Sequence, residues 1–248
     1  MRNIKLTIEY DGKPFNGWQK QQDRLNIQGE IEKAISNITK EDVDLIGSGR
    51  TDAGVHALGQ VANFRTNSNI PIDKMAIAIN SQLKNSIVIK EAVEVDEKFH
   101  SRYNAKRKTY RYVINNSKYG SAIYRNLEYC FPIKLDVEKM KEAAKYFEGE
   151  HDFKAFKSSG TSSKSSVRTI YKAEVKYDKE AEKIVIELTG NGFLYNMVRI
   201  ISGTLLDVGL GKIKPTDIPN IIESKDRQKA GKTLPAYGLF LLNVNYEN

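Results

Sequence analysis

Apolar and polar residues alternate strictly at the start of the chain. Over 4–10 the even positions are apolar or aromatic and the odd positions are polar, a period of two that predicts a β-strand with one dry face. Apolar residues then recur at helical spacing over 27–38, and again over 71–83, a segment that proline opens. Further strands are predicted at 44–47, 60–65 and 87–95. The first half therefore has the order β-α-β-β-α-β.

The second half repeats this order loosely, without visible sequence identity to the first. Strands are predicted at 108–114, 170–177, 183–189 and 239–246, and helices at 136–147 and 194–208. Alternation within the middle strands favours an antiparallel sheet with helices on one face and water on the other. We therefore predict an α+β fold with subdomains 1–104 and 105–248, and a cleft between them that is lined by the loop around Asp52.

Composition narrows the classes of protein. The chain has 248 residues, 40% of them hydrophobic, and a formal net charge of +8, which favours a polyanionic partner. One cysteine and three histidines allow no internal disulfide and no metal-ligand cluster of recognisable spacing, so no metal is predicted. The charged start and the lack of a long apolar run predict a cytoplasmic protein without a signal peptide or membrane span.

The segment Gly47–Ala57 carries the candidate chemistry. It sets Arg50 and Asp52 among three glycines, which permit positive φ and close approach of the backbone to a ligand. In an extended segment these two side chains project to the same side. A reactive carboxylate beside a phosphate-binding guanidinium is one interpretation, and an Asp that caps its own turn is the other.

Several further blocks, in order along the whole chain, make the sequence similar to the tRNA pseudouridine synthase A family. The signature of that family resembles Gly49–Ala57 followed by Gly59–Phe64. The other blocks are Tyr10–Gly12, Phe15–Gln19, Phe99–Arg102, Arg107–Tyr112, Phe147–Phe153, Gly192–Arg199 and Gly238–Leu241.

The resemblance implies a pseudouridine synthase fold, in which two ferredoxin-like halves with a mainly antiparallel sheet form a central RNA-binding cleft. It implies isomerisation of uridine to pseudouridine at position 38, 39 or 40 in the anticodon arm of tRNA, by a homodimer. The reaction has no redox step, so no metal or nucleotide cofactor is expected. Two alternatives are a catalytically silent RNA-binding protein and a glycosidase that releases or exchanges the base.

The resemblance also assigns roles to residues. Asp52 acts on a flipped-out uridine, at C1′, C6 or C2′, and Arg50 helps to flip and hold the nucleotide. Tyr110 stacks on the target base and Leu239 walls the pocket. Arg199 pairs with the catalytic aspartate, and the helix predicted over 194–208 places it about a turn and a half from the helix start.

Two other segments indicate contact with RNA. Residues 102–111 interleave five cations with two tyrosines, a pattern typical of backbone binding and base stacking, although Tyr112 on the same face is assigned to the core. The serine-rich stretch 158–166 predicts a mobile loop, either an exposed connection or a flap that orders on RNA. No metal role is assigned to His56, His100 or His151.

Overall fold

The computed structural model describes residues 1–160 and 165–247. Residues 161–164 of the predicted serine-rich loop therefore lie outside the described residues. The chain forms two compact units, one comprising Met1–Lys106 with Phe240–Asn248 and the other comprising Arg107–Leu239. Within 1–160 and 165–247, no helix is long and apolar enough to cross a membrane.

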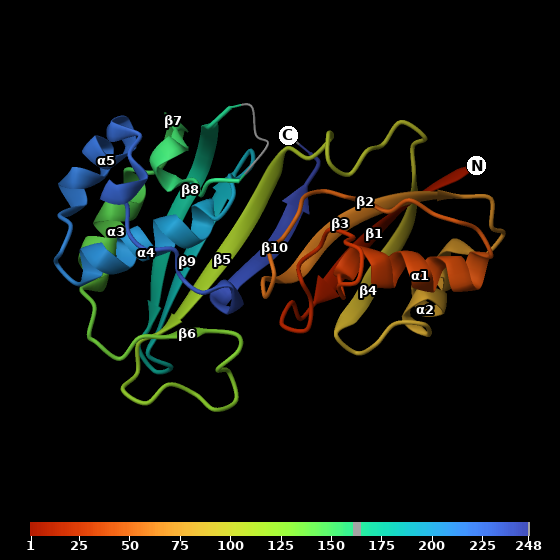
Figure 1. Ribbon diagram of the computed structural model, residues 1–248, viewed down its shortest axis with the longest axis horizontal. Coiled ribbons are helices and arrows are strands. Elements are labelled where there is room, and N and C mark those ends of the chain that lie inside the picture. Colours follow the sequence, from red (N-terminus) through yellow and green to blue (C-terminus); the bar gives the residue numbers. More distant parts are fainter. Residues whose placement is uncertain (161–164, 248) are drawn as a thin grey trace. The chain divides into compact units, whose positions relative to one another are not determined.

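Unit 1 is a sheet with two helices on one face (Figure 1). Its strands pair in the order β4-β1-β3-β10, and β2 adds to β3. All of these pairs are antiparallel except β3 with β10, which is parallel. The elements are β1 (Arg2–Tyr10), α1 (Ile27–Thr39), β2 (Ile46–Gly47), β3 (His56–Thr66), α2 (Ile72–Asn80), β4 (Ile87–Val95) and β10 (Leu239–Asn245). The predicted order β-α-β-β-α-β is the order observed up to β4.

The core of unit 1 follows from the two sequence periods. Alternate residues of β1 are fully buried, among them Ile4 and Leu6. α1 contributes isoleucines at helical spacing, including Ile31, which is also fully buried. The helix begins where the Asn26 side chain accepts the Gly29 N–H at 2.8 Å, because that bond satisfies a backbone donor that has no partner inside the helix.

Within unit 2 the sheet strands pair antiparallel in the order β5-β9-β8-β7, and the short β6 pairs in parallel with β5. α3 and α4 cover one face of this sheet (Figure 1). On β5, β8 and β9, an ion-pair ladder of Arg111, Glu187 and Lys176 joins neighbouring strands, with N–O distances of 2.6 and 3.0 Å. The elements are β5 (Arg107–Asn115), β6 (Tyr129–Cys130), α3 (Val137–Lys145), β7 (Gly149–Asp152), β8 (Val167–Asp178), β9 (Lys183–Gly190), α4 (Met197–Gly209) and α5 (Ile218–Ser224).

The start of α4 differs from its predicted position. Leu194–Asn196 form a turn, in which the Met197 N–H bonds the Leu194 carbonyl at 3.0 Å, and Asn196 has φ 61°. A residue in the left-handed region cannot continue a right-handed helix, so α4 begins at Met197. Arg199 consequently lies in the first helical turn and not a turn and a half into the helix, which corrects the prediction.

Gly203 tests how tightly α4 is packed. A Cβ at this position would stand 1.9 Å from the Lys232 carbonyl oxygen. Alanine normally stabilises a helix interior relative to glycine by about 1 kcal/mol. Here we expect Gly203→Ala to lower the free energy of unfolding by about 1 to 3 kcal/mol, because backbone atoms must move apart. Urea denaturation measures this change.

The matched control is Gly192→Ala, where the added Cβ would meet only the Arg168 side chain at 3.8 Å or more. This variant should stay within about 0.5 kcal/mol of the wild type, as substitutions away from tight contacts usually do. Equal stability of the two variants would show that α4 has room at Gly203.

Candidate active site

The loop between β2 and β3 carries Asp52 in unit 1. The Asp52 carbonyl accepts the Val55 N–H at 3.1 Å, and Gly54 takes φ +79°, so the chain turns tightly at this point. Two bonds fix the preceding residue, Thr51. Its carbonyl accepts the Trp18 N–H at 3.0 Å, and the Thr51 hydroxyl lies 2.7 Å from the Tyr10 hydroxyl. The backbone on both sides of Asp52 is thus fixed.

Two glycines allow the 10–18 segment to lie directly against this loop. A Cβ on Gly12 would stand 1.9 Å from the Val55 carbonyl oxygen, and one on Gly17 would stand 2.6 Å from the Thr51 carbonyl oxygen. Gly17 also has φ +89°, which side chains rarely tolerate. Close approach of backbone to backbone therefore requires glycine at both positions, and the sequence blocks around them serve to position the loop.

A buried polar pair holds the other end of the loop. The Ser48 hydroxyl donates to Gln60 Oε1 at 2.6 Å, and Gln60 Nε2 donates to the Gly49 carbonyl at 3.1 Å. Both side chains are fully buried. Since buried polar groups are costly unless they are bonded, these two bonds specify one loop conformation.

His56 has a packing role in unit 1. Its side chain is buried, the Gly12 N–H donates to its Nδ1 at 3.1 Å, and its ring stacks on Phe240 with centroids 4.9 Å apart. Asp11 Oδ1 also lies 3.1 Å from Nδ1. No group of three or more potential metal ligands occurs among the described residues.

The fixed loop presents two chemically useful side chains. Arg50 is exposed and Asp52 is half-buried. A half-buried carboxylate on immobile backbone can act as a nucleophile or general base, because its position does not have to be ordered at the moment of reaction. The neighbouring guanidinium can bind a phosphate.

Unit 2 holds the other predicted site residues. Tyr110 is half-buried on β5 and packs edge-on against Phe193, with centroids 5.2 Å apart and an interplanar angle of 81°. The structure thereby brings the Arg107–Tyr112 and Gly192–Arg199 blocks together. Tyr112 is fully buried and donates its hydroxyl to the Pro235 carbonyl at 2.8 Å, so its assignment to the core is confirmed. Burial raises the pKa of the Tyr112 hydroxyl.

Arg199 and Leu239 complete the predicted set. Arg199 is half-buried; its Nε donates to the Leu234 carbonyl and its Nη1 to Asn196 Oδ1, both at 2.7 Å. A guanidinium is planar and suited to binding a carboxylate or a phosphate. Leu239 is buried at the start of β10.

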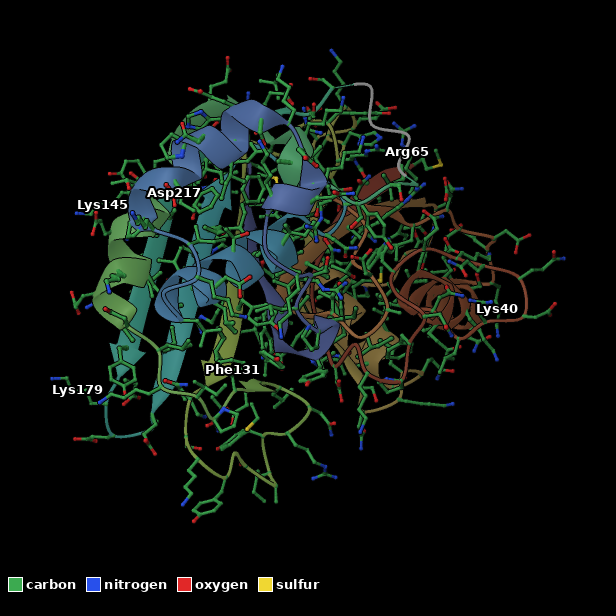
Figure 2. The ribbon with its side chains drawn as sticks, turned by 60° about the vertical axis from the view of Figure 1, so that its left-hand side comes forward. Lys40, Arg65, Phe131, Lys145, Lys179 and Asp217 are labelled. Carbon is green, nitrogen blue, oxygen red and sulfur yellow. The ribbon has the colours of Figure 1, made fainter. Side chains whose placement is uncertain are left out.

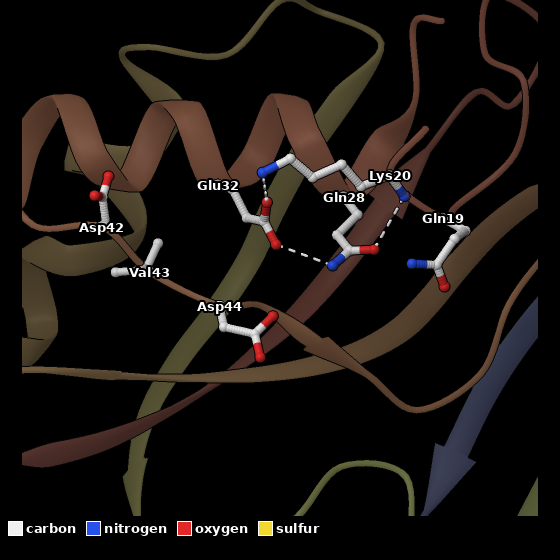
Figure 3. Close-up of a pocket in the computed structure, with 7 residues that line it drawn as sticks. All are labelled: Gln19, Lys20, Gln28, Glu32, Asp42, Val43 and Asp44. Carbon is white, nitrogen blue, oxygen red and sulfur yellow. Dashed lines mark hydrogen bonds and ion pairs between the residues drawn. The ribbon is translucent and has the colours of Figure 1, made fainter. Parts of the chain in front are cut away.

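A pocket of about 550 Å³ in unit 1 contains none of the predicted site residues (Figure 3). Among its lining residues, the buried Glu32 accepts bonds from Lys20 Nζ and Gln28 Nε2, each at 2.9 Å. Gln28 also accepts the Lys20 N–H at 3.1 Å through its side chain and donates its own N–H to the Trp18 carbonyl at 3.0 Å. Trp18 in turn bonds Thr51, so this network connects α1 to the Asp52 loop. The lining residues are Gln19, Lys20, Gln28, Glu32, Asp42, Val43 and Asp44.

Lys20 tests this network through its titration. The hydrogen bond and charge of Glu32 raise the pKa of Lys20 above its usual 10.5. A raised pKa means that the pair stabilises the fold fully below pH 10.5 and that this contribution disappears as pH rises further. We expect unfolding measurements to show a steeper loss of stability above pH 10.5 for the wild type than for Glu32→Gln.

Lys33→Gln, which removes an exposed lysine from the same helix, should keep the wild-type slope. A Glu32→Gln variant with the wild-type slope would contradict the proposed coupling.

Comparison with known proteins adds a further finding. A family model described as tRNA pseudouridine synthase matches residues 6–104 and 143–247. The tRNA pseudouridine synthase A of Caldicellulosiruptor saccharolyticus is 57% identical over 246 residues, and that of Acetivibrio thermocellus is 56% identical over the same number. Each alignment covers 99% of this chain and 100% of the relative. Among solved structures, one described as the archaeal box H/ACA sRNP Nop10-Cbf5 complex has a TM-score of 0.38 and 13% identity, and the match covers 82% of this chain and 44% of that chain.

Proposed function

The chain belongs to the tRNA pseudouridine synthase family, and we propose that it isomerises uridine at position 38, 39 or 40 in the anticodon arm of tRNA, with Asp52 as the catalytic carboxylate. Family membership makes it an isomerase that acts on uridine in tRNA and gives it the α+β pseudouridine synthase fold. The positions in tRNA and the role of Asp52 are the proposal.

The reaction sets the requirements of the site. The bond from N1 of uracil to C1′ breaks, the detached base turns, and C5 forms a bond to C1′. C5 then loses its hydrogen as a proton, and N1 gains a proton, so that the atoms balance. No electrons are gained or lost overall, so the reaction needs no redox cofactor. It does need a carboxylate next to a nucleotide that has left its stack.

The fixed Asp52 loop is the observation that supports this proposal best. A turn that merely connects β2 to β3 would not require glycines at 12 and 17, where an added Cβ would stand 2.6 Å or less from a carbonyl oxygen of the loop. Nor would it require the buried Ser48–Gln60 pair. Such precise positioning is expected of a catalytic group, since small displacements of that group cost large factors in rate.

The remaining assignments form part of the same proposal. Arg50 holds the flipped nucleotide or its phosphate, Tyr110 supports the target base, and Leu239 walls the pocket. Arg199 binds an anion, which the resemblance identifies as Asp52. Its place in the first turn of α4 supports anion binding, because the helix dipole disfavours an uncompensated cation there. We propose that the active form is a homodimer, on the resemblance alone.

Tritium release tests the proposed reaction. The wild-type protein should release tritium from tRNA that contains [5-³H]uridine while the base remains attached to the RNA. Transcripts with a single uridine at position 38, 39 or 40 then identify the position. Asp52→Asn should lower the rate at least about 100-fold, as loss of a nucleophile or base does, with affinity for tRNA within a few-fold of the wild type.

Other outcomes would support the alternatives. Binding without release of tritium would indicate a silent RNA-binding protein, and release of free uracil would indicate a glycosidase. Residual turnover of Asp52→Asn above about 1% would exclude Asp52 as the catalytic group.

Arg199 is tested by the pH dependence of single-turnover rates. If its charge favours an ionised carboxylate at Asp52, Arg199→Leu should lose the active anion as pH falls. The variant should be slow at pH 6 and recover partly towards pH 9, whereas the wild type stays flat between pH 6 and 8. Arg199→Lys should be intermediate, because lysine restores the charge but not the planar fork. A parallel profile for Arg199→Leu and wild type, or a loss confined to tRNA binding, would identify Arg199 as a phosphate contact.

A further inference from the structure

The segment 116–134 of unit 2 has no role in the function described so far. It follows β5, contains β6 and lies outside the two ranges matched by the family model. It extends beyond the end of the sheet of its own unit (Figures 1 and 2), where Phe131 is labelled in Figure 2. Its sequence is Asn-Ser-Lys-Tyr-Gly-Ser-Ala-Ile-Tyr-Arg-Asn-Leu-Glu-Tyr-Cys-Phe-Pro-Ile-Lys.

Buried polar groups fix the base of this segment. Glu128 is 3% exposed and accepts a bond from Asn115 Nδ2 at 2.6 Å, and Lys183 Nζ lies 2.8 Å from its other oxygen. Asn116 Nδ2 donates to the carbonyls of Phe131 and Ile133, at 2.7 and 2.8 Å. Burying a carboxylate with its counter-ion carries a desolvation cost, so this ion pair adds little to the free energy of folding. Its bonds nevertheless hold the base of the segment in one conformation.

The fixed base supports a region of exposed aromatic and basic side chains at Lys118–Arg125, which we call the aromatic tip. Tyr119 is 87% exposed and Tyr124 is 48% exposed. A cation lies over each ring. Lys118 Nζ is 5.1 Å from the Tyr119 ring centroid, and Lys183 Nζ is 4.2 Å from the Tyr124 ring centroid. Exposed rings with adjacent cations are the components with which proteins bind single-stranded nucleic acid.

Charge restricts the occupant of the tip. Lys118 and Arg125 have no acidic residue between them in sequence, and Glu128, the nearest one along the segment, is neutralised by Lys183. The acidic turn between β8 and β9 adjoins the segment at its base, where the Glu182 carbonyl accepts the Asn116 N–H at 2.8 Å. A polyanion is therefore expected at the tip and not at the base.

We propose that the aromatic tip binds unpaired nucleotides of RNA, with Tyr119 and Tyr124 as stacking surfaces and Lys118 and Arg125 as phosphate contacts. The inference rests on the proposed function in one respect, since the RNA is taken to be the tRNA substrate. It adds an RNA contact beyond those assigned to the reacting uridine.

Binding of a labelled, unmodified tRNA transcript, measured by fluorescence anisotropy in 150 mM salt, tests the proposal. Tyr119→Ala and Tyr124→Ala should each weaken binding about fivefold or more, as loss of a stacked base does. The corresponding phenylalanine variants should bind like the wild type, because they keep the ring. Tyr146→Ala removes a tyrosine that is 36% exposed in the same unit but outside the segment, and should leave affinity unchanged.

A competition experiment adds a second readout. Single-stranded RNA should displace the transcript from the wild type more effectively than duplex RNA of equal length, and this preference should shrink in the two alanine variants. Thermal unfolding of each variant verifies that the fold is retained, and sedimentation velocity measures its oligomeric state.

Three outcomes would overturn the proposal. The two alanine variants could bind like Tyr146→Ala, the phenylalanine variants could be as weak as the alanine variants, or the alanine variants could change the oligomeric state, which would assign the tip to a second copy of the chain. Wild-type protein that binds the transcript but makes no pseudouridine would contradict the proposed function and leave the tip proposal standing, so the two failures are distinguishable.

Discussion

Contact between the backbone of the 10–18 segment and the backbone of the Asp52 loop is the constraint on which the candidate site of unit 1 depends. The two glycines allow these segments to lie closer than any side chain would permit, and the Trp18–Thr51 hydrogen bond joins them. The Ser48–Gln60 pair and the α1 network through Glu32 hold the partners of that contact. The loop is therefore shaped by three separate parts of unit 1, and Asp52 takes its position from all of them.

The sequence predicted what depends on local period. Alternation over β1 and helical spacing over α1 are properties of neighbouring residues, and both elements lie where the pattern placed them. The glycine-rich loop was recognisable through its resemblance to the family signature, because Gly and Asp by themselves are ordinary turn residues. Family membership was predicted from sequence blocks that occur in the same order along the chain. It is confirmed by the family model and by relatives with more than half of their residues identical.

Other features depend on contacts that no local pattern encodes. Leu194 continues an apolar stripe, but the left-handed backbone of Asn196 means that the helix begins only after Asn196 and excludes Leu194. Asparagine is only one of several residues that adopt this conformation, so the sequence did not predict this start. The roles of Gln28 and Glu32 were also missed. Their spacing of four residues on a buried helix face was the available signal, since buried polar residues at helical spacing require partners nearby.

The parallel pairing of β10 with β3 has a consequence for biosynthesis. Phe240 stands beside His56 in this pair, and all of unit 2 separates them in the chain. Unit 2 is therefore an insertion within unit 1, and it can fold as soon as it leaves the ribosome. Strand β3, which begins shortly after the Asp52 loop, must wait for a partner strand synthesised after unit 2, so the sheet of unit 1 is completed last in a nascent chain.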